Sequence, residues 1–161
     1  MVILMTMENN YAIAIFNREI DYIVKPFFSN IPKIEKLIII SDKNSIDDEK
    51  KRILLDFLNT VNIKYDFIYL NDITNFFQVY FIVSIISLNE GNPVWVNASC
   101  GSGIGMAALT LHAVKNNIKI ILYEKESNRT SIVDIKKLQK INLFDLKYLN
   151  IIKELNKGHN T

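Results

Sequence analysis

The feature that most constrains the fold is a series of short apolar runs that alternate with segments of helical periodicity. Five such runs occur, each four to six residues long, at 11–16, 36–40, 65–70, 93–96 and 118–123. Apolar residues are nearly continuous within them, which is typical of parallel strands that helices cover on both faces. The sequence therefore predicts an α/β fold with a doubly wound, mainly parallel sheet.

The connections between these runs predict the order of the strands. Right-handed crossovers give an order near 3-2-1-4-5, as in Rossmann-like folds, with the first and fourth strands as neighbours. Ligands of open α/β sheets bind at this switch point, in the crevice formed by loops at the carboxyl ends of the strands. These loops are 17–21 and 97–105, so we expect a binding site there.

Residues 94–108 join a buried strand to a helix of small residues through a turn rich in glycine and serine. Glycines let the backbone approach a ligand because they lack a Cβ atom. The free amides and the dipole of a helix N-terminus both attract anions such as phosphate. A tight turn without a ligand would show the same glycines, so the motif alone leaves both interpretations open.

The predicted ligand contacts come from the two loops, and none of them is expected to be catalytic. They are Asn17, Arg18, Asn97, Ser99, Cys100, Gly101, Ser102, Gly103 and Ile104. A nucleophilic cysteine or serine would need a base within reach, and both histidines, His112 and His159, lie outside the loops. We therefore expect Cys100 to be a small turn residue, the serines to donate to a ligand, and Trp95 to lie in the core.

A second motif overlaps the same turn. Gly103-x-Gly105-x-x-Ala108 fits the glycine fingerprint of dinucleotide-binding proteins, and Glu124 is placed for a ribose contact. That fingerprint normally follows the first strand of a mononucleotide-binding half, whereas here it follows the fourth. Binding of NAD or another dinucleotide is therefore the less favoured interpretation.

Composition and charge exclude several function classes. A chain of 161 residues fits one domain with its own core, and a net charge of +2 is too weak for nucleic-acid binding by bulk electrostatics. One cysteine excludes an internal disulfide, so a cytoplasmic location is expected. The apolar start, residues 1–7, is too short to span a membrane, and no membrane association or metal site is expected.

The pattern changes after residue 125. Residues 132–138 fit a short helix or an extra strand, and 144–155 fit an amphipathic helix that Gly158 ends. We therefore expect a ligand-binding domain over 1–125 and a C-terminal linker and helix over 126–161. That helix would pack on its own sheet, mediate dimerisation, or begin a winged-helix domain that the chain lacks.

The segment Asn97-Ala98-Ser99-Cys100-Gly101-Ser102-Gly103-Ile104 resembles the Asn-x-(Ser/Thr)-x-Gly-(Thr/Ser)-Lys-hydrophobic motif of the CARF family, the CRISPR-associated Rossmann-fold ligand sensors. Residues 15–24 and 70–76 are similar to segments of archaeal CARF-like transcriptional regulators, so the resemblance covers roughly residues 11–125. The lysine of the family motif falls on Gly103. Arg18 is the candidate that would replace its positive charge.

The resemblance implies a function. CARF proteins bind cyclic oligoadenylates, or ligands still unknown, across a two-fold dimer, so it implies a homodimeric sensor of a nucleotide second messenger that regulates transcription or CRISPR defence. Some standalone members cleave the ring, and the alternative is therefore a metal-independent ring nuclease in which the 2′-hydroxyl of the ligand attacks. The missing lysine favours the sensor, whereas the missing DNA-binding domain favours the enzyme. DNA binding would need an additional domain, and no cofactor besides the nucleotide is implied.

Overall fold

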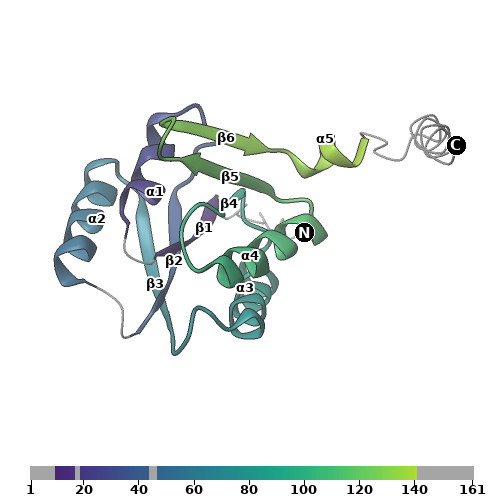
Figure 1. Ribbon diagram of the computed structural model, residues 1–161, viewed down its shortest axis with the longest axis horizontal. Coiled ribbons are helices and arrows are strands. Elements are labelled where there is room, and N and C mark those ends of the chain that lie inside the picture. The colour runs from purple at the N-terminus through teal and green to yellow at the C-terminus, as the bar shows by residue number, and fades with distance from the viewer. Residues whose placement is uncertain (1–9, 17–18, 44–46, 141–161) are drawn as a thin grey trace, which may run out of the picture.

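The structure is a computed structural model, and it describes residues 10–16, 19–43 and 47–140. Within these residues a six-stranded sheet lies between two layers of helices, with strand order β3-β2-β1-β4-β5-β6 (Figure 1). The strands are β1 Tyr11–Phe16, β2 Lys36–Asp42, β3 Lys64–Leu70, β4 Trp95–Asn97, β5 Lys119–Glu124 and β6 Arg129–Val133. The predicted Rossmann-like α/β fold and its strand order are confirmed, and β6 adds an antiparallel edge strand.

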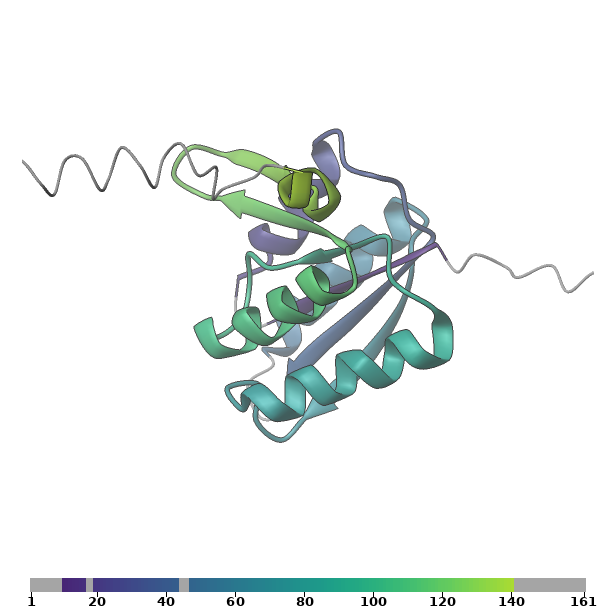
Figure 2. The ribbon, with the colours of Figure 1, turned by 90° about the vertical axis from the view of Figure 1, so that its right-hand side faces the viewer.

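The helices divide between the two faces of the sheet. The short α1 (Asp21–Val24), the 3-10 helix η1 (Lys25–Phe28) and α2 (Asp48–Thr60) lie on one face, which we call the α2 layer. Helices α3 (Phe76–Glu90) and α4 (Gly103–Lys115) lie side by side on the other face, the α3–α4 layer (Figure 2). The chain first moves towards β3 and then towards β6, so right-handed crossovers place the two sets on opposite faces.

The central strand β1 serves both layers. Its odd-numbered residues pack under α3 and α4, and its even-numbered residues pack under η1 and α2. All its residues are fully buried, which explains why the apolar run in the sequence is continuous. Trp95 lies in the core as expected, and its Nε1 donates to the carbonyl of Pro32 at 2.9 Å.

Polar residues before the helical segments predict caps at Ser45 and at Asp72 or Thr74, and the small residues predict a helix from Met106. Helix α3 begins at Phe76 as predicted, but both caps and the start of α4 differ. The cap of α2 is Asp47, whose carboxylate accepts from two backbone amides, and not Ser45, which lies outside the described residues. Helix α3 is capped by Asn75 and not by Asp72 or Thr74. Helix α4 begins at Gly103, earlier than expected, because Ser102 caps it. A cap is chosen by a side-chain bond to the first turn, and neighbouring Ser, Asp and Asn residues compete for that role.

The sheet continues past residue 125. Strand β6 pairs antiparallel with β5, and helix α5 (Ile135–Lys140) follows it. The helix predicted over 144–155 and its end at Gly158 lie outside the described residues. The division of the chain into domains at residue 125 stays a prediction. In the described part of the chain, no helix has the length and apolar character needed to cross a bilayer.

Candidate functional site

The predicted site lies at the carboxyl edge of the sheet, where β1 and β4 are paired neighbours. Segments of three loops meet at this edge: residues 19–20 before α1, 98–102 after β4, and 125–128 after β5. Residues 98–102 lead directly into α4, and we call them the glycine loop. Two predicted contacts, Asn17 and Arg18, lie outside the described residues.

Asn97 joins the end of β4 to helix α1. Its side chain is buried, its Nδ2 donates to the carbonyl of Tyr22 at 2.8 Å, and its Oδ1 accepts from the amide of Ser99 at 2.9 Å. Both ends of the side-chain amide are therefore bonded to backbone groups. This arrangement fixes the path of the glycine loop relative to α1.

Ser99 and Cys100 join the glycine loop to the two neighbouring loops. The hydroxyl of Ser99 accepts from the amide of Tyr123 at 2.6 Å and donates to the carbonyl of Ile121 at 3.4 Å. The thiol of the buried Cys100 donates to the carbonyl of Glu19 at 3.7 Å. Side chains of the glycine loop thus connect the ends of β1, β4 and β5 into one unit.

The glycines of this region differ in whether the structure requires a residue without a Cβ atom. Gly101 has φ +125°, and a Cβ there would lie 2.8 Å from Cγ2 of Ile15 in the core. A Cβ at Gly105 would lie 2.8 Å from the carbonyl oxygen of Ile73. Gly103, in contrast, is exposed and a Cβ there would meet open space. A Gly101→Val variant would therefore report on folding, whereas position 103 can be varied to probe a ligand.

Ser102 defines the N-terminus of α4. Its hydroxyl accepts from the amide of Gly105 at 3.0 Å and donates to the carbonyl of Ile73 at 2.9 Å, and its carbonyl accepts from the amide of Met106. The amides of Gly103 and Ile104 precede the first intrahelical bond and have no acceptor in the described part of the chain. Both residues are exposed, so two backbone donors and the positive end of the helix dipole are available to an anion.

Lys125 is a residue of this edge that the sequence analysis missed. Its Nζ donates to Oε2 of Glu19 at 2.7 Å, and this bond raises the pKa of the ammonium group. Together with Ile20, Asp21 and Lys50, the pair lines a shallow depression of about 390 Å³. The sequence did hold a signal for Lys125: it comes just after the predicted strand 118–123, and all parallel strands end at the same edge of the sheet.

His112 is not placed to activate the glycine loop. It lies buried between α3 and α4, where its Nε2 is 2.9 Å from Oγ of Ser87, and burial lowers the pKa of the imidazole. The other histidine, His159, lies outside the described residues. The described ranges also contain no group of three or more His, Cys, Asp or Glu residues that could hold a metal ion.

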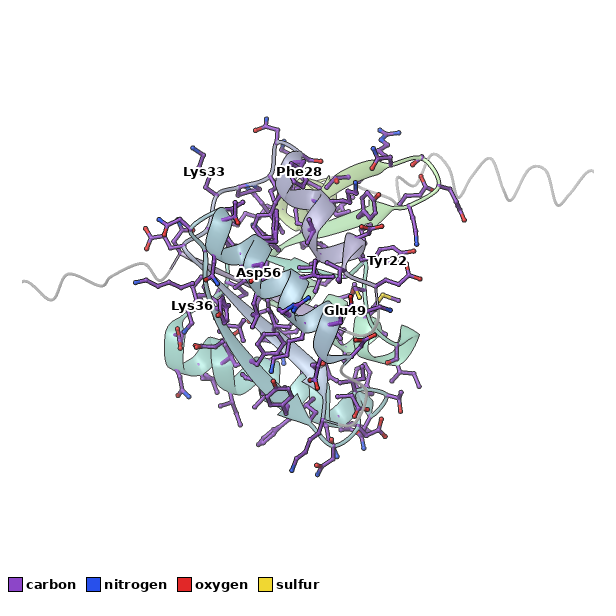
Figure 3. All side chains as sticks on the ribbon, turned by 90° about the vertical axis from the view of Figure 1, so that its left-hand side faces the viewer. Tyr22, Phe28, Lys33, Lys36, Glu49 and Asp56 are labelled. Atoms are coloured by element: carbon purple, nitrogen blue, oxygen red, sulfur yellow. The ribbon has the colours of Figure 1, made fainter. Side chains whose placement is uncertain are left out.

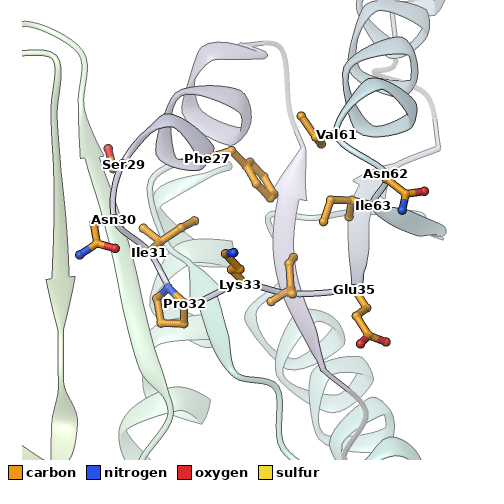
Figure 4. A pocket seen from close by; sticks show the side chains of 11 residues that line it. Phe27, Ser29, Asn30, Ile31, Pro32, Lys33, Glu35, Val61, Asn62 and Ile63 are labelled. Carbon is orange, nitrogen blue, oxygen red and sulfur yellow. The ribbon is translucent and has the colours of Figure 1, made fainter.

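A larger hollow, about 470 Å³, lies at the opposite, amino-terminal edge of the sheet (Figure 4). It is lined mainly by apolar side chains of the segment before β2 and the turn before β3, among them Phe27, Ile31 and Ile63. This edge is away from the switch point at which ligands of doubly wound sheets bind. The carboxyl edge therefore remains the candidate site.

Solved structures with a similar fold include the following three. Can2 from Sulfobacillus thermosulfidooxidans, in complex with cyclic tetra-adenylate, aligns with a TM-score of 0.64 and 17% identity over 78% of this chain and 35% of its own. Protein VC1899 from Vibrio cholerae aligns with a TM-score of 0.64 and 19% identity over 78% of this chain and 36% of its own. A type III CRISPR defence DNA nuclease activated by cyclic oligoadenylate gives a TM-score of 0.59 and 11% identity over 77% and 20%.

At these identities the similarity concerns the fold alone. This chain spans about a third or less of the length of each of these proteins. No protein-family model matches the sequence, and no curated protein matches it.

Proposed function

We propose that this chain is a ligand-sensing domain of the CARF type. It binds a cyclic oligoadenylate or a similar phosphate-bearing second messenger as a homodimer, and it regulates transcription or CRISPR defence. The observation that carries the proposal is that the amides of two exposed residues, Gly103 and Ile104, have no acceptor among the described residues and lie at the switch point of the sheet. Two supports are independent of it: the glycine loop carries the motif that resembles the family, and the fold is similar to that of Can2, which was solved with cyclic tetra-adenylate.

The surface of the α3–α4 layer supports the dimer. Residues 76–89 and 103–114 contain no Asp, Glu, Lys or Arg, although they form two surface helices. Phe77, Phe81 and Leu88 of α3 are 80%, 66% and 83% exposed, and Ile104 and Leu111 of α4 are also exposed. Exposed apolar patches of this kind mark interaction surfaces, and a two-fold contact between identical patches is the commonest way to cover one.

The same surface would connect the dimer to the site. Ile104 is one of the exposed apolar residues of this layer and lies in the first turn of α4, whose amides are the proposed phosphate contacts. A two-fold contact through the α3–α4 layer would therefore bring the two helix N-termini towards each other. One symmetric ligand could then contact both chains.

Position 103 offers a direct test because its side chain would point into open space. Gly103→Pro removes one proposed donor, and proline suits the first position of a helix. Ser102 before it has φ −71° and ψ 149°, the conformation that a residue before proline prefers. Gly103→Lys adds a positive charge at the position of the family lysine, and Gly103→Ala is the matched control because it adds only a Cβ.

Calorimetry with cyclic oligoadenylates of several ring sizes would measure the effect. We expect Gly103→Pro to weaken binding by about 1 kcal/mol, the worth of one hydrogen bond. Gly103→Lys should strengthen it by about 1 kcal/mol through a partly exposed charge contact, and Gly103→Ala should bind like the wild type. Equal binding by the proline variant and the wild type would show that the amide of Gly103 does not hold the ligand.

The alternative, a ring nuclease, differs in turnover. Incubation of the wild type with labelled cyclic tetra-adenylate would show binding with the ring intact if the domain is a sensor. Accumulation of linear product would identify the enzyme. In that case the glycine loop would position the ligand for attack by its own 2′-hydroxyl.

A further inference from the structure

We propose that Lys125 is a phosphate-binding residue of this site, and that Glu19 competes with the ligand for it. This inference rests on the proposed function and adds to it the residue that supplies positive charge. Lys125 and Glu19 are 106 positions apart in the sequence, and their side chains are 52% and 51% exposed. An ion pair with this exposure contributes little to stability, so an incoming phosphate can replace the carboxylate at small cost.

The backbone next to each partner of the ion pair is bonded to the glycine loop. On one side, the carbonyl of Glu19 accepts from the thiol of Cys100. On the other side, the amide of Tyr123, two residues before Lys125, donates to the hydroxyl of Ser99 at 2.6 Å. Glu19 and the segment that carries Lys125 are thus both bonded to the loop that leads into α4.

The charges that line the depression explain why a phosphate would displace Glu19 from Lys125. Two carboxylates, Glu19 and Asp21, and two ammonium groups, Lys50 and Lys125, line it, so its charges balance in the structure. The glycine loop itself contains no charged residue, and position 103, which carries lysine in the similar family motif, is glycine. A ligand phosphate that displaces Glu19 would gain a charge-assisted bond from Lys125, which stays protonated at neutral pH with or without its partner.

The test compares Lys125→Gln and Glu19→Gln with Lys119→Gln, which removes a positive charge from the amino-terminal end of β5, the strand that Lys125 follows. Pyrophosphate and cyclic tetra-adenylate serve as separate probes in calorimetry at low salt, after thermal unfolding has shown that each variant is folded. We expect Lys125→Gln to weaken binding about tenfold and Glu19→Gln to tighten it about threefold. Lys119→Gln should bind like the wild type, and the differences should shrink as salt is raised.

The double variant, Lys125→Gln with Glu19→Gln, tests whether Glu19 acts through Lys125. If Glu19 acts by competing for Lys125, then Glu19→Gln should no longer tighten binding in the Lys125→Gln background. A gain that persists in that background would show that Glu19 acts only through the general charge of the surface, and would overturn the competition. Because Glu19→Gln is expected to improve binding, misfolding cannot imitate the predicted result.

The two probes separate this inference from the proposed function. If pyrophosphate shows the expected pattern but cyclic tetra-adenylate and other ring sizes do not bind, the proposed function fails and the role of Lys125 stands. If a cyclic oligoadenylate binds equally well to the wild type and to Lys125→Gln, the role of Lys125 is overturned and the proposed function stands. If no probe binds to the wild type, both are overturned.

Discussion

The two helical layers pack on the same sheet but present different surfaces to solvent. Helix α2 is amphipathic: Leu54 and Leu58 face the core, and charged residues such as Glu49 and Asp56 project outward (Figure 3). Helix α3 is apolar on all sides, with buried residues such as Val79 and exposed ones such as Phe81. An amphipathic helix needs one packing surface, whereas a helix that is apolar all round needs a second. We infer that the α2 layer ends at solvent and that the α3–α4 layer continues into a partner.

Breaking the apolar surface should have the largest effect. We expect Phe81→Glu to weaken dimerisation about 100-fold, because burial of a carboxylate at an apolar contact costs about 3 kcal/mol. Phe28→Glu is the matched control, since Phe28 is similarly exposed but belongs to the α2 layer. Sedimentation at micromolar concentration would show a dimer for the wild type and for Phe28→Glu, and a mass near 18.6 kDa for Phe81→Glu. A wild-type mass of one chain would contradict the dimer.

Removal of a helix cap should destabilise the α3–α4 layer more than the α2 layer. Asp47→Ala removes an exposed, local cap from α2, and we expect it to lower the free energy of unfolding by about 1 kcal/mol. Ser102→Ala removes the cap of α4 and also the donor to the carbonyl of Ile73, so the expected loss is about 2 kcal/mol. Urea unfolding would measure both values. Equal losses would mean that the bond to Ile73 contributes nothing.

The smallest expected effect is a dependence of stability on pH that arises from His112 in the α3–α4 layer. Burial lowers the pKa of His112 in the folded chain from its ordinary value of 6.5, with a smaller contribution from Lys115. Between that lowered value and 6.5 the unfolded chain binds more protons, so stability should fall as the pH is lowered through this window. His112→Gln should flatten the dependence in thermal unfolding scans at several pH values. The same slope in this variant would assign the effect to other groups.

The sequence predicted the parallel strands, which are recognised by their runs of apolar residues. It misplaced the helix caps, for which several neighbouring polar side chains compete. Strands β1, β2 and β4 were visible because a strand covered on both faces must be apolar at successive positions. Strand β3 lies at an edge of the sheet and is only partly buried, so it was visible through its strand-favouring aromatic and β-branched residues instead. Strand β6 was ambiguous because it is an edge strand with exposed residues such as Arg129 and Ile132. Helix caps lie a few residues from those predicted because several nearby side chains can cap, and only the folded backbone decides which one does.

Within the site, the sequence located the edge of the sheet but not the roles of its residues. It identified the glycine loop because glycines and a helix start follow a buried strand. It could not distinguish Gly101, which is required by packing against Ile15, from Gly103, which faces open space. It also missed Lys125, since nothing in the local sequence shows that Glu19 lies beside it.

The sequence by itself therefore determined the sheet, the order of its five parallel strands and the edge at which the loops meet. These features follow from rules that act along the chain: continuous burial of strands and the handedness of crossovers. Only the tertiary structure decided which loop side chains join one another, which amides of α4 have no acceptor among the described residues, and that none of the described helices or strands covers the apolar α3–α4 surface. Each of these depends on contacts between residues distant in sequence, and such contacts form only once the chain has folded.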